Sequence, residues 1–326
     1  MRGGVFVEQS RSGRQWLPVS LVLLQGLLYG LGDPISKAAY DVMPVFSLLS
    51  IRYLLALAIF MLFAGKRVVA GLKRCAPRDW LVPSLCMGGA YVAGNIALEL
   101  TAATSVAFLR SLSTVMTPLL ALAVFRRKYR WQQIPIQLLV VVGLYLLCGL
   151  GGLSGFGAGE LFSLLSALLV AGSLVFGESA LDRVDPITLS ALQTAASALM
   201  ATVCAPVFSG GWHLERMTPQ IWGIVIYLAV GCTIAGYVLQ NAALTAVSSR
   251  TVALLQCFCP VMTALFSRLI LEERLSTAGM AGAVIILACV AAETMLPDGP
   301  PLTKAENPAA STPENLESSS ERNDLP

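Results

Sequence analysis

The sequence is poor in charge and almost free of histidine. Only 13% of its 326 residues are charged, and His213 is the one histidine. Soluble domains average about 25% charged residues, so this composition excludes an ordinary soluble protein. A single histidine in the chain also makes a zinc or haem site unexpected.

Cysteine is present but not grouped. The eight cysteines are scattered, and only Cys257 and Cys259 lie close together in the chain. Residues two apart on a helix point to different sides, so this pair does not suit a metal ion, and no disulfide framework is indicated. The chain also lacks the GxxxxGK[ST] motif that cradles nucleotide phosphates. We therefore expect no cofactor and no direct drive by ATP.

Long apolar runs are what the sequence has in abundance. Hydrophobic residues make up 56% of it, and the mean hydropathy is +0.73. A helix needs about 20 mostly apolar residues to cross the hydrocarbon core of a bilayer. The predicted fold class is an all-α integral membrane protein with ten transmembrane helices. The expected spans are 17–36, 44–63, 81–101, 104–125, 133–150, 158–178, 188–208, 220–243, 247–271 and 276–295.

Lysine and arginine predict the orientation of these spans. If the N-terminus is inside, the outer loops hold only Lys37, Arg216 and Arg274, and most other basic residues face inward. Cytoplasmic loops are enriched in Lys and Arg, so we expect both termini in the cytoplasm and the protein in the plasma membrane (the inner membrane if bacterial). We expect residues 1–16 to form a short cytoplasmic segment without a removable signal peptide. Residues 296–326 are polar and predict a disordered cytoplasmic tail.

The chain repeats itself at an offset of about 146 residues. Spans three to five align with spans eight to ten, and the matching pairs are "VAFL" (106–109) with "VALL" (252–255) and "VMT" (115–117) with "VMT" (261–263). Because each copy has five spans, the second enters the membrane from the opposite side, which gives an inverted-topology repeat. The two predicted five-helix repeats are 17–150 and 158–295.

One motif in the second copy carries a family resemblance. The stretch "PVMTALFSRLILEERLSTAGMAGAVIILACV" places Pro260, Glu273 and Gly282 in a "P…E…G" pattern. With "GDPISKAAYD" at the end of span one and "SIRYLLALAIF" in span two, the chain resembles the EamA-type members of the drug/metabolite transporter superfamily over nearly its whole length. In the first copy Thr114 takes the proline position and Arg127 the glutamate position. The resemblance implies a permease with one central site that is reached alternately from each side.

Polar residues form narrow lines on otherwise apolar spans. Residues spaced by four share a helix face, and such spacing recurs in spans one, three and eight. We interpret these lines as facing a central water-filled cavity; the alternative is that they join helices by hydrogen bonds. The predicted substrate path comprises Gln25, Tyr29, Asp33, Tyr91, Asn95, Glu99, Arg110, Thr114, Tyr237, Gln240, Asn241 and Gln256.

The charges in this set need a reason, because a charge at mid-bilayer costs about 3 kcal/mol or more. The repeat-mates of Glu99 and Arg110 are Thr245 and Gln256, so the second copy builds the same helices without charge. An acid beside an arginine suits a proton or a zwitterion such as an amino acid. Glu99 and Asp33 are therefore the candidate proton-coupling residues. The alternative is snorkelling to the interface or a structural ion pair.

The sequence as a whole predicts a secondary transporter of small metabolites, amino acids or amphiphilic drugs. We expect export by alternating access, with proton coupling or exchange. The expected partners are a small-molecule substrate and membrane lipid, with no nucleic acid; a homodimer stays open. One alternative is a non-transporting membrane sensor or scaffold. The other is a membrane-embedded enzyme, which would need clustered catalytic or metal-binding groups that the sequence does not offer.

Overall fold

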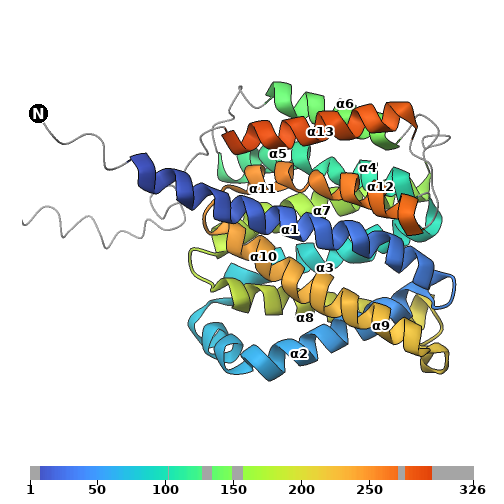
Figure 1. Cartoon of the computed structure of the whole chain (residues 1–326). Helices are drawn as coiled ribbons and strands as arrows, with labels where there is room; N and C mark the ends of the chain where they lie inside the picture. The colour runs from blue at the N-terminus through green and yellow to red at the C-terminus, as the bar shows by residue number, and fades with distance from the viewer. Residues whose placement is uncertain (1–7, 102, 127–133, 149–156, 271–275, 296–326) are drawn as a thin grey trace, which may run out of the picture.

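The computed structural model describes residues 8–101, 103–126, 134–148, 157–270 and 276–295. Within these ranges the chain is helical, and the helices lie side by side (Figure 1). The first half contains α1 (Glu8–Tyr40), α2 (Val45–Arg74), α3 (Pro77–Leu100), α4 (Ala103–Ser111), α5 (Ser113–Phe125) and α6 (Ile134–Cys148). The second contains α7 (Ala158–Ala180), α8 (Pro186–Phe208), η3 (Leu214–Arg216), α9 (Pro219–Tyr227), η4 (Leu228–Ala235), α10 (Gly236–Leu244), α11 (Ser249–Leu255), α12 (Phe258–Ile270) and α13 (Thr277–Met295).

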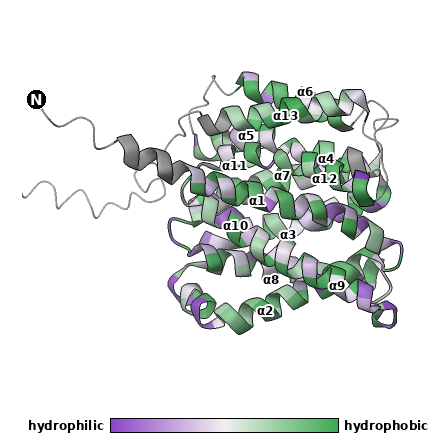
Figure 2. Cartoon of the chain, in the orientation of Figure 1, coloured by the Kyte–Doolittle hydropathy of each residue, from purple (hydrophilic) through white to green (hydrophobic). Residues whose placement is uncertain are grey.

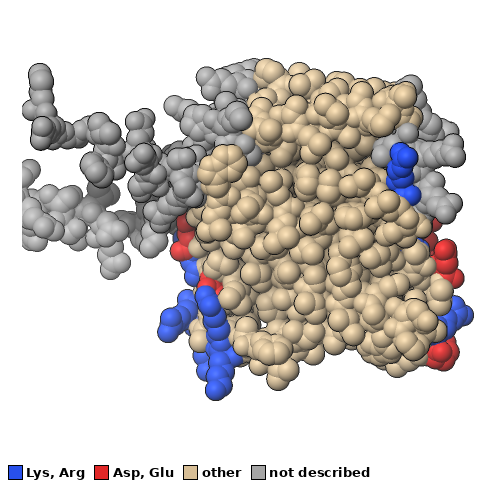
Figure 3. Space-filling view, in the orientation of Figure 1, with Lys and Arg blue, Asp and Glu red and all other residues tan. Residues whose placement is uncertain are grey.

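The helices have the length and composition of membrane spans. The described residues include eight spans that are long and apolar enough to cross a bilayer, and two shorter apolar helices, Ile134–Leu147 and Thr277–Ala292. Apolar residues predominate along the helices (Figure 2), and the charged side chains seen in Figure 3 lie at the two ends of the bundle, with an uncharged band between them. Charges leave a bilayer-thick band free because burying them in lipid is costly. The predicted all-α membrane fold is confirmed.

The packing of the helices shows the inverted repeat. Helix α1 packs against α9–α10 and α11–α12 of the second half, and α7 packs against α3 and α4–α5 of the first. Helix α2 packs on α8 and α6 packs on α13, so each of these pairs joins equivalent helices of the two halves. A pseudo-two-fold axis between inverted copies produces this exchange of contacts. In Figure 1 the α6–α13 pair lies at one edge of the bundle and α2 lies at the other.

Local sequence explains where several helices of the second half begin. Three side chains accept a hydrogen bond from a backbone N–H in the first turn, which is the usual role of an N-cap. Asp185 accepts from the Thr188 N–H, Thr218 from the Ile221 N–H, and Ser248 from the Thr251 N–H. Proline follows the first two of these caps, where its missing N–H costs nothing. These helices are therefore stopped from extending towards their N-terminal neighbours.

Two predicted spans are not continuous helices. Span four divides at Leu112, and span nine divides at Gln256 and Cys257. These breaks fall within two residues of each other at the repeat offset. Pro260 has no N–H to donate to the Gln256 carbonyl, which accepts from the Cys259 N–H at 2.9 Å instead. Each of these two spans therefore consists of two consecutive helices, and each as a whole is still long and apolar enough to cross a membrane.

Span eight is also irregular. Its middle, η4, is π-helical, and the Thr233 hydroxyl donates to the Leu228 carbonyl five residues earlier at 3.0 Å. The same hydroxyl oxygen accepts from Nε of Arg52 on α2 at 3.0 Å. Wide turns of this kind are frequent at functional sites. Here the wide turn brings a hydroxyl against a buried arginine.

At the end of the bundle where α2 meets α3, two ion pairs join the halves. Arg67 contacts Asp185 at 2.6 Å, and Arg183 contacts Asp79 at 2.9 Å. Partial burial on its own would raise the pKa of Asp185, but hydrogen bonds from Arg67 and from the Thr188 backbone hold that pKa below its ordinary value. Exposed pairs of this kind contribute about 0–1 kcal/mol each. Their contribution to the stability of the fold is therefore small.

Candidate functional site

A central cavity lies between the two halves of the bundle. Its volume is about 90 Å³, and one water needs roughly 10–15 Å³, so several waters or a small organic molecule fit. Its walls come from α1, α3, α4 and α5 on one side and α7, α10, α11 and α12 on the other. Both helix breaks contribute lining residues, so the cavity sits where the regular helices are interrupted.

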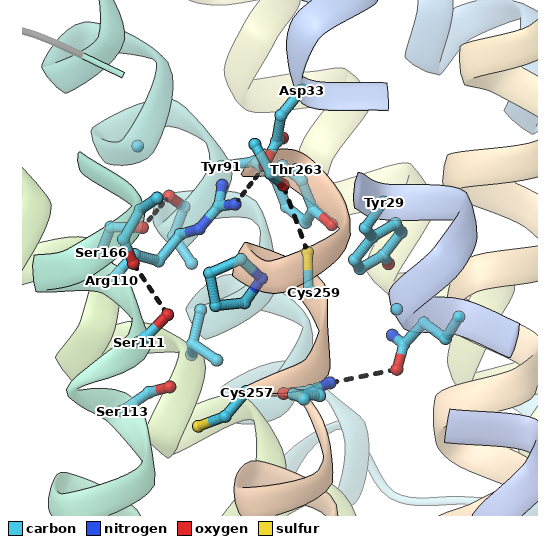
Figure 4. Close-up of a pocket in the computed structure, with 18 of the residues that line it drawn as sticks. Tyr29, Asp33, Tyr91, Arg110, Ser111, Ser113, Ser166, Cys257, Cys259 and Thr263 are labelled. Carbon is cyan, nitrogen blue, oxygen red and sulfur yellow. Dashed lines mark hydrogen bonds and ion pairs between the residues drawn. The ribbon is translucent and has the colours of Figure 1, made fainter. Parts of the chain in front are cut away.

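An ion pair crosses this cavity between α1 and α4. Arg110 Nη2 lies 2.8 Å from Asp33 Oδ2, and Figure 4 shows the two side chains pointing towards one another. Thr263 Oγ1 of α12 lies 3.5 Å from the same carboxylate oxygen. Each side chain of the pair keeps about a quarter of its surface exposed, 26% for Arg110 and 27% for Asp33. The ion pair is therefore partly accessible to solvent and to a ligand of similar size.

The same ion pair stands where three cavities meet. Asp33 and Arg110 line the central cavity, a small cavity of about 10 Å³ next to Lys37, and a side cavity of about 30 Å³ next to Arg52. The central and side cavities also share Tyr29, Tyr91 and Asn95, so the ion pair is one part of the boundary between these spaces.

Three glutamines form a hydrogen-bonded group in another part of the wall. Gln240 Oε1 accepts from Gln25 Nε2 at 3.0 Å and from Gln256 Nε2 at 2.9 Å. Gln256 Nε2 also lies 3.1 Å from Gln25 Oε1. Gln240 Nε2 is buried and finds no acceptor among the described residues. This leaves the two N–H donors of one amide group without an acceptor in a wall built from α1, α10 and the break in span nine.

Tyrosine and asparagine side chains complete the lining. The Tyr29 hydroxyl is buried and makes no hydrogen bond within the described part of the chain. Asn95 is fixed in place, because its carbonyl accepts from the Tyr40 hydroxyl and its amide donates to the Tyr91 carbonyl at 2.7 Å. The cavity therefore combines fixed polar groups with aromatic surface.

Most of the residues predicted for the path line this cavity. They are Gln25, Tyr29, Asp33, Tyr91, Asn95, Arg110, Gln240 and Gln256. Glu99 does not belong to this group. Its side chain is exposed in the last turn of α3, and the acid that pairs with Arg110 is Asp33. The expectation of an acid at Glu99 beside Arg110 is corrected: α3 has turned away from the cavity by that position.

Three further predicted residues are buried between helices instead. Asn241 donates to Ser190 at 2.9 Å and to Gln193 at 2.7 Å, both on α8. Tyr237 is fully buried, and Thr114 is 1% exposed on α5. None of the three is among the residues that line the cavities described above. Asn241 and Tyr237, whose hydroxyl contacts Ser197 and Tyr53, fit the alternative interpretation, in which polar residues join helices. The Thr114 hydroxyl is buried and has no hydrogen-bond partner among the described residues.

Some lining residues were not in the predicted set. They are small side chains near the helix breaks and in α7, together with the arginine of the side cavity: Ser111, Ser113, Ser166, Cys257, Cys259, Thr263 and Arg52. Figure 4 shows several of them around the ion pair. The sequence signal for the small ones is weak, since Ser and Cys are common in membrane helices. Among the described residues no group of three His, Cys, Asp or Glu is placed to hold a metal ion.

A cavity with a partly buried ion pair, enclosed between two inverted five-helix repeats in a bundle with the charge distribution of a membrane protein, is typical of the class of multi-pass membrane transporters. The EamA-like transporter family matches residues 16–149 and 157–292, and the chain belongs to that family. The match is twofold, once for each half. This membership agrees with the resemblance drawn from the "P…E…G" pattern.

Individual relatives agree with the family. A protein of Archaeoglobus fulgidus named an uncharacterized transporter is 24% identical over 267 residues, which is 82% of this chain and 82% of the relative. Another of the same organism and name is 28% identical over 254 residues, covering 75% of this chain and 86% of the relative. A solved crystal structure has the same fold, with a TM-score of 0.71 at 18% identity, over 85% of this chain and 96% of its own. The protein is a membrane transporter.

Proposed function

We propose that this transporter moves small amphiphilic metabolites, amino acids among them, through the central cavity by alternating access. It acts as a permease rather than as an enzyme. The observation that carries the proposal is the Asp33–Arg110 ion pair, which is partly exposed at the meeting point of three cavities. Opposite charges held side by side in a wet cavity suit a ligand that has both an amine and a carboxylate.

The asymmetry of the two halves supports a binding role for these charges. Arg110 and its repeat-mate Gln256 both line the central cavity, one beside each helix break. In the second half, the residue at the helix break is Gln256, whose side-chain amide is uncharged. A guanidinium is therefore not needed to build this kind of junction, and we attribute its presence in the first half to its pairing with Asp33 at a ligand site.

Asp33 is the residue that we propose for proton coupling. A proton on Asp33 would neutralise the carboxylate and weaken its hold on Arg110, while a substrate amine on Asp33 would exclude the proton. Proton and substrate then compete for one group, which is the requirement for antiport. With an inward proton gradient, the substrate leaves as the proton enters, so the direction is export.

The two ends of the bundle support the proposed orientation. The described basic residues of the α2–α3 junction, Lys66, Arg67, Lys73, Arg74 and Arg78, lie at one end. We propose that this end faces the cytoplasm of a plasma-membrane protein, because cytoplasmic loops are the basic ones. The ion pairs that join the halves at this end then form a cytoplasmic contact that opens in the transport cycle.

Tracer flux in proteoliposomes tests the path. Ala107 lines both the central cavity and the small cavity next to Lys37, so Ala107→Phe places a ring in the path. Ala123 is exposed on the surface of α5, so Ala123→Phe adds the same ring outside the path. We expect pools of labelled amino acids, metabolites and cationic drugs to show flux in the wild type and in Ala123→Phe, and none in Ala107→Phe. Equal flux in both variants, with both folded by size-exclusion chromatography, would place the path elsewhere; no flux or exchange in the wild type would contradict transport by this chain.

A further inference from the structure

A second buried arginine lies beside the ion pair. Arg52 of α2 is only 6% exposed, and it lines the side cavity together with Asp33 and Arg110. This side cavity also shares Tyr29, Tyr91 and Asn95 with the central cavity. A molecule in the central cavity can therefore extend one group towards Arg52.

The orientation of Arg52 is fixed through one edge of its guanidinium. Nε donates to Thr233 Oγ1 at 3.0 Å, and this hydroxyl is itself held by the π-helical turn of span eight. The guanidinium carbon lies 5.1 Å from the ring centre of Tyr53 and 5.9 Å from that of Tyr91. Aromatic rings stabilise the charge but supply no hydrogen-bond acceptor to the terminal amino groups. Within the described residues, Nη1 and Nη2 have no hydrogen-bond acceptor and no acidic partner.

The charge balance of the side cavity is positive. Two guanidinium groups and one carboxylate line it, which leaves one positive charge without an anion. Buried charges in proteins are normally paired, and within membranes an ionisable side chain marks a functional site by default. The volume of the side cavity, about 30 Å³, admits roughly two waters, which is close to the size of one carboxylate group.

We propose that Arg52, assisted by Arg110, forms a carboxylate-binding subsite, so that the transported substrate carries a carboxylate. The planar fork of an arginine matches a carboxylate with two parallel hydrogen bonds. The amine of a zwitterionic substrate then faces Asp33, and its apolar part lies in the central cavity against Tyr29 and Tyr91. This proposal rests on the proposed function, because only a transported ligand is a substrate. Binding of a carboxylate to the subsite can nevertheless be measured without transport.

The competing explanation is structural: Arg52 could serve only to clamp α2 to span eight through Thr233 and the two tyrosines. A clamp predicts loss of stability on substitution but no preference between a carboxylate and an uncharged isostere. The subsite predicts such a preference in the unaltered protein. The test can therefore begin on the wild type and does not depend on whether a variant folds.

The experiment uses the full chain, purified in detergent, with thermal unfolding as the readout of binding. The probes are butyrate, benzoate, L-alanine and L-phenylalanine, each beside its own amide at the same ionic strength. We expect at least one carboxylate to raise the unfolding midpoint with saturation, and its amide to leave the midpoint unchanged. Arg52→Gln should weaken the apparent affinity about tenfold or more, and Arg52→Lys should weaken it less.

A matched control removes an arginine elsewhere. Arg268 is exposed on α12, so Arg268→Gln should bind the carboxylate like the wild type. Absence of any preference for a carboxylate over its amide, or unchanged affinity in a folded Arg52→Gln, would overturn the subsite. Carboxylate binding without flux would keep the subsite and remove the proposed transport. Equal flux of a carboxylate and its amide would keep the proposed transport and contradict the carboxylate subsite.

Discussion

Gly236 makes room for a tyrosine that lines the central cavity. Gly236, at the start of α10, has no side chain, and a Cβ built there would lie 2.5 Å from Cε1, 2.8 Å from Cζ and 2.7 Å from Oη of Tyr29. Real Cβ atoms do not approach this closely, so in Gly236→Ala the Tyr29 ring must move. Tyr29 lines the central cavity, and its displacement changes the shape of the site.

The size of the effect follows from two opposing contributions. Overpacking costs about 1–3 kcal/mol, whereas replacing a helical glycine by alanine gains up to about 1 kcal/mol. Gly236→Ala should therefore change the free energy of unfolding by a net loss of up to about 2 kcal/mol. Gly223, in α9 of the same span, has no atom within 4 Å of its built Cβ, so Gly223→Ala should gain about 0.4–1 kcal/mol.

Thermal unfolding and tracer flux measured on the same preparations test this prediction. We expect Gly236→Ala to be less stable than Gly223→Ala and to transport more slowly, while Gly223→Ala transports like the wild type. Adding Tyr29→Leu to Gly236→Ala should recover part of the lost stability, because it removes the ring that the new methyl group meets. If Gly236→Ala were as stable and as active as Gly223→Ala, the contact between α10 and Tyr29 would not be as close as the structure places it.

Two more substitutions test how the halves are joined. A Cβ on Gly282 of α13 would lie 2.4 Å from the Gly143 carbonyl oxygen and 2.6 Å from the Leu147 backbone nitrogen of α6, so Gly282→Val should separate these helices and cost about 3 kcal/mol, seen as a lower unfolding midpoint. Asp185→Asn removes the ion pair with Arg67 and should cost about 1 kcal/mol or less at neutral pH. Since the pKa of Asp185 is lowered in the folded protein, its contribution is present above the unfolded pKa of about 3.9 and is lost as the pH falls through the folded pKa. The stabilities of the wild type and Asp185→Asn should therefore converge in acid; a difference that persists there would contradict an electrostatic role.

The sequence was sufficient to predict the ten spans and the inverted repeat. Hydropathy and the charge of short loops are local properties, and the repeat is visible as matching short stretches such as "VMT" at 115–117 and 261–263. These features do not depend on how the helices are rotated about their axes. The fold could be predicted for that reason.

The rotation of each helix is what the sequence did not provide. A spacing of four residues turns about 40° beyond a full circle in an α-helix, so a polar line drifts around its helix. On α3 the cavity-lining arc runs from Met87 to Asn95, and one more step carries Glu99 out of it. In span eight the π-helical turn shifts the register, so Gln240 lines the cavity while Tyr237 and Asn241 face other helices.

The sequence also did not predict which acid pairs with Arg110. Asp33 is distant from it in the chain, and the two meet because α1 packs against α12 of the ninth span, which also contacts α4. Glu99, by contrast, is closer to Arg110 in the sequence, but its side chain is exposed on α3 and does not line the cavity. A contact between separate helices depends on tertiary packing, which periodicity does not encode.

The most direct test of the central claim compares these two acids. Wild type, Asp33→Asn and Glu99→Gln would be reconstituted in liposomes with an internal pH dye, and proton movement would be recorded when a transported substrate is added. We expect protons to move with substrate in the wild type and in Glu99→Gln, and not in Asp33→Asn. Asp33→Asn loses its contact with the substrate amine, but it should still exchange a carboxylate substrate, more weakly, through Arg52 and Arg110. Proton movement that survives in Asp33→Asn, or is lost only in Glu99→Gln, would contradict the assignment of coupling to the ion pair in the cavity.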